Sequence, residues 1–108
     1  MYSQSSFPNS AGVTVNHLPT VELLENTHTF PCLYTFKVIG RSEDGFVARA
    51  VAAIRDQLEG EVDPPYRVRE TRGGRHIAVS LEPLVQNGWE VVAIYQRLSL
   101  LAGLEYVF

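Results

Sequence analysis

The sequence has few of the residues that would support redox chemistry, secretion or membrane insertion. Cys32 is the only cysteine in 108 residues, which excludes an intrachain disulfide and a cysteine cluster for zinc and favours a reducing compartment. No apolar run approaches the roughly 20 residues that span a bilayer. No lysine or arginine precedes Lys37, so a secretory signal peptide is not expected. We therefore expect a soluble, cytoplasmic protein.

Positive charge is also scarce. Nine lysines and arginines face twelve acidic residues, which gives a formal net charge of -3. General affinity for nucleic acid or for an anionic membrane needs a positive field, so neither partner is expected. The length fits one small domain. A domain of this size buries a modest share of its surface, which leaves open a protein partner or a homo-oligomer that covers apolar surface.

The chain divides into a leader and a patterned region. Residues 1–28 are rich in Ser, Asn, Thr and Pro and show no lasting period, which predicts a mobile leader. Residues 21–25 could form a helical turn or a docking peptide, but five residues do not form a stable helix alone. Residues 29–108 are expected to form the domain.

The domain reads as alternating strands and helices. Alternating apolar residues predict strands, and apolar residues at intervals of three and four predict helices. Ser42 is a candidate N-cap of the first helix and Asn87, or Gln86, of the second, while Gly73-Gly74 predicts a hairpin turn. The expected strands are 33–40, 66–70, 76–82 and 104–108, and the expected helices are 43–60 and 86–102.

This βαββαβ order predicts an α+β, ferredoxin-like two-layer sandwich, in which two helices cover one face of a four-stranded antiparallel sheet. The first and third strands should lie in the centre. The uncovered face should carry Thr35, Lys37, His76, Ala78 and Ser80, with apolar Leu33, Ile39 and Val107 on it as well.

An RNA-recognition module shares this order of elements. It stacks bases on aromatic side chains of the uncovered sheet face. Here Tyr34 and Phe36 are expected on the helix side, and no other stacking platform is evident. Nucleic acid is therefore not the expected partner.

An arginine-rich hairpin is the strongest local charge feature. Arg67, Arg69, Arg72 and Arg75 supply four of the nine basic residues, and His76 follows them. Together these side chains could hold a phosphate, a carboxylate or an acidic partner surface. The alternative is a solvated edge hairpin whose charges discourage aggregation. The glycines between them do not form a phosphate loop, which needs GxxxxGK[ST] between a strand and a helix.

No catalytic or metal constellation is evident. His76 and Ser80 share a strand face but are separated by roughly 13 Å, beyond the reach that a base and its nucleophile require. Cys32 has no basic neighbour in sequence to activate it and is expected to be a buried structural thiol. His17, His28 and His76 show no metal-ligand spacing with Cys32. We expect no enzyme, no cofactor and no metal.

Residues 30–108 resemble the small bacterial YbeD-like family, a domain of unknown function whose members are sometimes labelled lipoate regulatory proteins. The resemblance implies a ferredoxin-like fold similar to ACT regulatory domains, which bind small metabolites, and it implies no catalytic residues. The matching segments are FPCLYTFKVIG with Phe30-Pro31 ahead of Phe36-Lys37-Val38, the hairpin that leads into Val79-Ser80-Leu81, and Val91, Ile94, Tyr95 and Leu98 before the last strand.

The segment VIGRSEDGFVARAVAAI is similar to the first strand, loop and helix of an ACT domain. The similarity implies that Gly40, Arg41 and Gly45 lie beside a small-molecule ligand, with backbone N–H groups at the helix N-terminus facing a carboxylate. Glu43 and Asp44 occupy the same positive end and would repel an anion. Ordinary helix capping is the alternative interpretation.

These observations predict a non-enzymatic regulatory or adaptor domain that binds a protein partner or a copy of itself. An ACT-type small-metabolite sensor is the alternative. An enzymatic role would require catalytic groups from a second chain.

Overall fold

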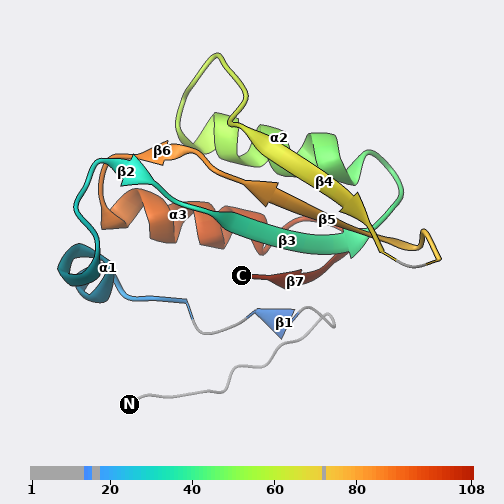
Figure 1. Cartoon of the computed structure of the whole chain (residues 1–108), viewed down its shortest axis with the longest axis horizontal. Helices are drawn as coiled ribbons and strands as arrows, with labels where there is room; N and C mark the ends of the chain where they lie inside the picture. Colours follow the sequence, from blue (N-terminus) through green and yellow to red (C-terminus); the bar gives the residue numbers. More distant parts are fainter. Residues whose placement is uncertain (1–13, 16–17, 72) are drawn as a thin grey trace.

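A computed structural model describes residues 14–15, 18–71 and 73–108 of the chain (Figure 1). The helices and strands follow one another as β1 (Thr14–Val15), α1 (Val21–Thr27), β2 (Cys32–Leu33), β3 (Phe36–Arg41), α2 (Phe46–Gln57), β4 (Tyr66–Glu70), β5 (His76–Leu81), β6 (Leu84–Val85), α3 (Gly88–Leu98) and β7 (Leu104–Val107). Among the described residues, no helix is long and apolar enough to cross a membrane.

The main sheet has the order β1-β7-β3-β5-β4. The pairs β3–β5, β3–β7 and β4–β5 are antiparallel, and β1 joins β7 in parallel. The α+β class with an antiparallel sheet is thus confirmed, and β3 and β5 lie in the centre. The expectation of a four-stranded sheet was incomplete, because β1 adds a fifth strand and β2 pairs with β6 in a separate two-stranded sheet.

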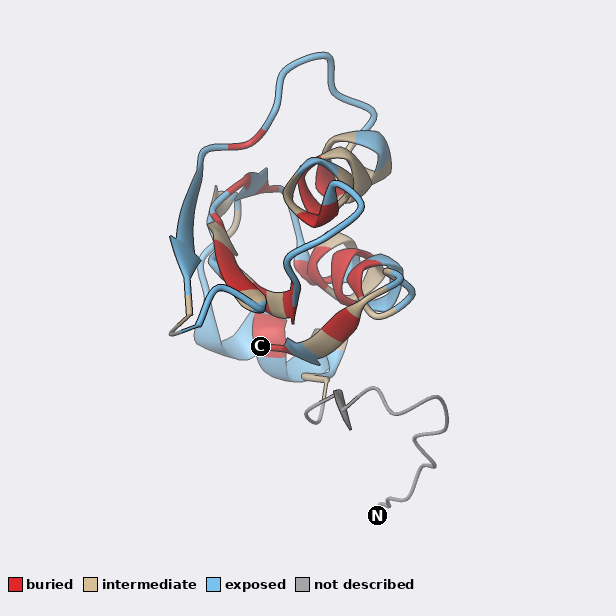
Figure 2. Ribbon diagram, turned by 90° about the vertical axis from the view of Figure 1, so that its right-hand side faces the viewer, coloured by how far each residue is buried: buried red, intermediate tan, exposed pale blue. Residues whose placement is uncertain are grey.

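Helices α2 and α3 lie side by side on one face of the main sheet (Figure 2). Strict alternation in β3 and β5 turns apolar side chains toward these helices and polar ones away. The core between the layers is built from Phe36, Val38, Val79, Leu81, Ile54, Ile94 and Leu98, all with zero exposure. None of the helices within residues 18–71 and 73–108 covers the opposite face of the sheet.

The first expected strand is interrupted at its start. Tyr34 and Thr35 lie between β2 and β3. The Tyr34 backbone N–H bonds to Pro83 O at 3.1 Å, and its hydroxyl lies 3.3 Å from that of Tyr95. Burial raises the pKa of the Tyr95 hydroxyl, and the hydrogen bond with Tyr34 adds to that shift. Tyr34 and Phe36 both pack on the core side, as expected.

Helix α2 begins at Phe46, three residues later than expected from its candidate cap. Gly45, not Ser42, occupies the N-cap position, and no side chain caps this end; Ser42 lies beside the hairpin, where its backbone N–H bonds to Arg75 O at 2.9 Å. Asp44 and Gly45 then take positive φ values of 55° and 68°, and this left-handed turn prevents helical continuation until Phe46. Asn87, by contrast, caps α3 as expected, with its Oδ1 accepting from Glu90 N at 3.0 Å.

Helix α1 lies within the segment expected to be leader. Thr20 caps it by accepting from Leu23 N at 3.0 Å, and Leu24 is 2% exposed in the core. Glu25 Oε2 accepts from the Gly88 N–H, at the first residue of α3, at 2.6 Å. Tertiary packing on α3 therefore supports a helix that is too short to be stable alone.

The last strand does not alternate as expected. The register between β3 and β7 shifts between Ile39 and Gly40, so that Gly40 pairs with Leu104 and Ile39 with Tyr106. This irregularity turns both Leu104 and Val107 into the core, at 3% and 1% exposure. The expectation that Val107 lies on the uncovered face was wrong for this reason.

Candidate partner-binding face

The uncovered face of the main sheet gathers most of the polar residues singled out in the sequence. We call it the open face. The register of the strands places on it Lys37, Ile39 and Arg41 of β3, Arg67 and Arg69 of β4, His76, Ala78 and Ser80 of β5, and Tyr106 of β7. Phe108 lies on the same face. Its N–H bonds to Lys37 O at 2.8 Å and its carbonyl accepts from Lys37 N at 3.1 Å, which places Phe108 directly opposite Lys37.

Basic side chains occupy one half of the open face. Ser80 of β5 is the cross-strand partner of both Lys37 and Arg67, so these two cations lie about 10 Å apart across two strand spacings. Arg69 occupies the next position on that face of β4. Within residues 18–71 and 73–108, no ion pair involves these three cations. The open face is therefore locally positive on a protein whose formal net charge is -3.

Two carboxylates with polar contacts to other residues lie at the ends of this face. Glu43, in the loop beyond β3, pairs with Arg41 at 3.3 Å. Glu82, just past β5, accepts from the Thr35 hydroxyl at 3.1 Å. Glu105 belongs to β7, which β3 and β5 separate from β4, so its carboxylate lies on the aromatic side of the sheet and away from Arg67 and Arg69.

An aromatic pair occupies the other half of the open face. The rings of Tyr106 and Phe108 stack with centroids 6.2 Å apart and planes inclined by 20°. Both side chains stay close to half exposed, at 45% and 47%. Sequence reasoning missed this pair as an open-face feature. A regular pairing of the last strand would have turned these two rings toward the helices. The irregularity opposite Ile39 and Gly40 reverses this, and nothing in the local sequence signals it.

The structure brings together residues from both candidate sites of the sequence. Arg41, expected beside a ligand, is the cross-strand partner of His76, expected in the anion cluster. Arg67 and Arg69 share the open face with them. Arg75 is exposed in the hairpin turn, where its carbonyl accepts from the Ser42 N–H. Arg72 lies outside the described residues.

The two glycines of the expected ligand loop have structural explanations. A Cβ on Gly40 would lie 2.4 Å from the ring atoms of Phe46, so the ring itself requires a glycine there. Gly45 takes a φ of 68° with nothing within 4 Å of a Cβ, so its role is to allow the left-handed turn before α2. The ligand role of Gly40, Arg41 and Gly45 stays a prediction.

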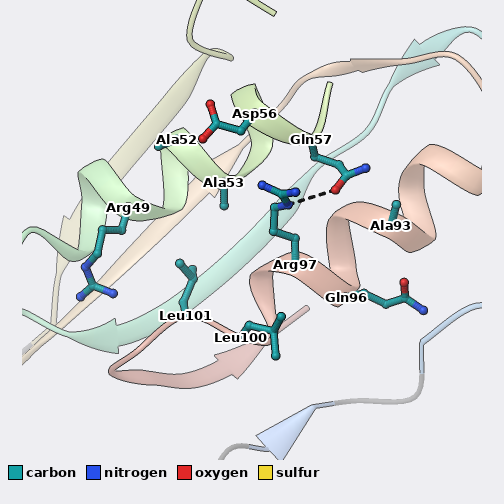
Figure 3. Close-up of a pocket in the computed structure, with 10 residues that line it drawn as sticks. All are labelled: Arg49, Ala52, Ala53, Asp56, Gln57, Ala93, Gln96, Arg97, Leu100 and Leu101. Carbon is teal, nitrogen blue, oxygen red and sulfur yellow. Dashed lines mark hydrogen bonds between the residues drawn. The ribbon is translucent and has the colours of Figure 1, made fainter. Parts of the chain in front are cut away.

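An open groove of about 760 Å³ runs between α2 and α3 on the far side of the molecule (Figure 3). Arg97 donates across it to Gln57 Oε1 at 3.0 Å. Arg49 donates to the carbonyl of Asp44 at 3.0 Å and to that of Ala102 at 2.8 Å. Both guanidinium groups thus serve contacts within the chain. The groove is therefore interpreted as a seam between two packed helices.

No reactive constellation emerges from the described part of the chain. His76 and Ser80 lie at opposite ends of the open-face side of β5. Cys32 is half-buried against the core, whereas full burial was expected. Among the described residues, no three His, Cys, Asp or Glu side chains are grouped so that they could hold a metal ion.

The fold and the open face together define a small α+β domain whose antiparallel sheet is covered by helices on one side. The chain belongs to the family described as Protein of unknown function (DUF493), which residues 25–108 match. The resemblance to an uncharacterised bacterial family is thereby confirmed, and the match begins inside α1, before the domain boundary expected at residue 29.

Relatives and a solved structure agree with this assignment. The chain is 30% identical over 76 residues to a UPF0250 protein of Buchnera aphidicola, covering 70% of this chain and 84% of that one. A UPF0250 protein of Haemophilus ducreyi is 25% identical over 95 residues, covering 88% and 95%. The solution structure of protein HP0495 from H. pylori has a TM-score of 0.59 at 16% identity, covering 97% and 98%, and shows a similar fold.

Proposed function

We propose that this chain is a non-enzymatic, cytoplasmic regulatory or adaptor domain of ferredoxin-like, ACT-like type, and that it binds a protein partner through the open face. The observation that carries the proposal is the adjacency of two features on one surface. Lys37, Arg67 and Arg69 form a cationic half without ion pairs among the described residues, and Tyr106 and Phe108 form an exposed aromatic half.

This combination resembles the composition of protein interfaces. Arginine and tyrosine are enriched among the residues that dominate binding energy, and aromatic rings add apolar contact area at low entropic cost. From the β7 aromatics to the β4 arginines the face spans three strand spacings, about 14 Å. A single structural element of a partner can therefore contact both halves at once.

The charge of the face indicates an acidic partner. A second copy of the chain is the weaker candidate for this surface, because its open face would bring three more cations and no carboxylate for Arg67 or Arg69 to contact. Exposed ion pairs contribute about 0.2–1 kcal/mol each, so three of them select the partner and its orientation. Burial of Tyr106 and Phe108 would supply more of the affinity.

One observation also favours the alternative, an ACT-type small-metabolite sensor. The structure places Arg41, from the expected ligand loop, directly across from His76. The Arg41 side chain is 56% exposed, so a small anion could reach it at this end of the sheet. The substitution of Gly40 described in the Discussion separates the two functions.

A capture experiment with charge-matched variants tests the proposal. The full-length protein is immobilised, exposed to an extract of its native cells, and the captured proteins are quantified by mass spectrometry. The open-face variant carries Arg67→Ser and Arg69→Ser. The control carries Arg55→Ser and Arg97→Ser, which remove the same charge from α2 and α3.

We expect a reproducible partner that is captured by the wild type and the control but lost with the open-face variant. Capture should also weaken as salt rises, because the Debye length shrinks from about 10 Å at 0.1 M toward 3 Å at 1 M. Equal capture by both variants, or no partner for the wild type, would contradict the proposal. Capture of nucleic acid in place of protein would contradict it too.

A further inference from the structure

Among the residues that the structure describes, strand β4 forms a free edge of the main sheet, because the strand order ends with it. Glu82 N bonds to Pro65 O at 2.9 Å and Thr71 N bonds to His76 O at 3.0 Å. Antiparallel strands alternate between bonded and non-bonded pairs. Between these two bonds, the odd-numbered residues Arg67 and Arg69 therefore bond to β5. The even-numbered residues Tyr66, Val68 and Glu70 direct their backbone N–H and C=O groups away from β5, toward the outside of the sheet.

The two faces of β4 differ in chemistry at this edge. Arg67 and Arg69 lie on the open face, opposite Ser80 and Ala78. Tyr66 and Val68 point to the other face, yet they remain 47% and 44% exposed. The whole strand is exposed (Figure 2). An incoming strand would thus meet cations on one face and apolar side chains on the other.

Pairing of this edge with its own copy is disfavoured by charge. In a two-fold antiparallel pair centred on Val68, Arg67 of each copy would lie opposite Arg69 of the other. Like charges directly opposite each other on paired strands are destabilising, and edge charges are a common protection against self-pairing. The same arginines attract a strand that carries carboxylates at the facing positions.

We infer that the β4 edge binds an extended segment of the protein partner, with acidic residues at alternate positions and apolar residues between them. The inference rests on the proposed function and specifies how the partner is recognised. The segment is added to the sheet as a further strand, through main-chain hydrogen bonds to Tyr66, Val68 and Glu70. Carboxylates contact Arg67 and Arg69, and the alternate apolar side chains pack on Tyr66 and Val68.

The flanks of β4 set the length of this segment. The outward position before Tyr66 is Pro64, which has no N–H to offer and ends the outer ladder on one side, and beyond Thr71 the chain turns at Gly73, which has a φ of 88°. Five strand residues with three outward-facing positions match a bound segment of about five to seven residues.

A designed peptide tests the inference directly. A labelled peptide of seven alternating glutamate and valine residues, flanked by Gly-Ser, is titrated with the full-length protein by fluorescence anisotropy. The same peptide with lysine in place of glutamate is the charge control. We expect the lysine peptide to bind at least about tenfold more weakly, since a tenfold loss corresponds to about 1.4 kcal/mol.

Two variants and one spectroscopic measurement localise the binding. Val68→Pro removes an outward N–H without removing a bond to β5, and it should weaken the glutamate peptide at least about tenfold. Val62→Pro, in an exposed loop, should leave binding unchanged. In the wild type, the peptide should slow amide hydrogen exchange at Tyr66, Val68 and Glu70, which face away from β5 and pair with no other described strand.

The outcomes separate this inference from the proposed function. Slower exchange at the three amides, together with loss of binding in Val68→Pro, supports edge pairing. The exchange measurement uses the wild-type protein, so it does not depend on whether a variant folds. Binding that spares these amides but is lost with Arg67→Ser and Arg69→Ser overturns edge pairing and leaves the open-face proposal standing. Absence of peptide binding also overturns edge pairing, while the capture experiment judges the proposed function.

Discussion

Substitution of Gly40 by alanine tests why a glycine occupies the middle of the sheet. Gly40 lies on the helix-facing side of β3, where the Phe46 ring packs against its Cα. A Cβ would lie 2.4 Å from two ring atoms of Phe46 and 2.8 Å from a third. Ordinary carbon contacts are about 3.5–4.0 Å, so the ring must move by more than about 1 Å. Phe46 is only 2% exposed, which leaves it little room to do so.

The expected cost follows from this overlap. Overpacking a core costs about 1–3 kcal/mol, and sometimes more when the neighbour is held on all sides. In a domain of this size, each kcal/mol lowers the melting temperature by about 4–8 °C. We therefore expect Gly40→Ala to lower the melting temperature by about 5–20 °C, measured by far-ultraviolet circular dichroism.

A double-mutant cycle identifies the ring as the cause. Phe46→Leu shortens the side chain, so Gly40→Ala should cost less in that background, with a coupling energy of about 0.5–3 kcal/mol. Gly45→Ala is the matched control. It strains a left-handed backbone by about 1–2 kcal/mol but has open space around its Cβ, so it should show no such coupling.

The reasoning is refuted if Gly40→Ala leaves stability unchanged. If such a stable variant also lost a thermal shift that a small carboxylate gives to the wild type, Gly40 would serve ligand approach, and the ACT-type sensor would become the better function.

Two further predictions concern contacts that sequence reasoning did not provide. Leu24→Ala should lower the free energy of unfolding by about 2–5 kcal/mol, because Leu24 is buried in the core; denaturant titration checks this, and a change below 0.5 kcal/mol would return α1 to a loosely attached leader. Tyr95→Phe should cost about 0.5–1.5 kcal/mol through the lost hydrogen bond with Tyr34. Because burial raises the pKa of Tyr95, the unfolded chain ionises first, near pH 10, so wild-type stability should fall as pH rises above that value and the Tyr95→Phe variant should fall less steeply; parallel pH profiles would contradict this.

Several elements could be predicted from the sequence because their causes are local. The alternation in β3 and β5, the Asn87 cap and the Gly73-Gly74 turn each depend on residues a few positions apart, and each is present. The arginine cluster of β4 was also visible, since two arginines two residues apart share a strand face wherever the strand lies.

Other features needed tertiary contacts. Helix α1 is too short to be stable alone and depends on burial of Leu24 and on the bond from Gly88 to Glu25. The open-face position of Tyr106 depends on a register irregularity opposite Ile39 and Gly40. Neither cause lies within the segment that it shapes, so no local pattern could show it.

The sequence by itself therefore determined the strands β3, β4 and β5, the two helices that cover the sheet and the place where the arginines concentrate, because backbone periodicity and turn chemistry act over a few residues. Only the tertiary structure decided which side chains meet. It placed Lys37 two strands from Arg67, set the aromatic pair beside them and left β4 as the edge, because cross-strand register and strand order are fixed by packing between residues distant in the chain.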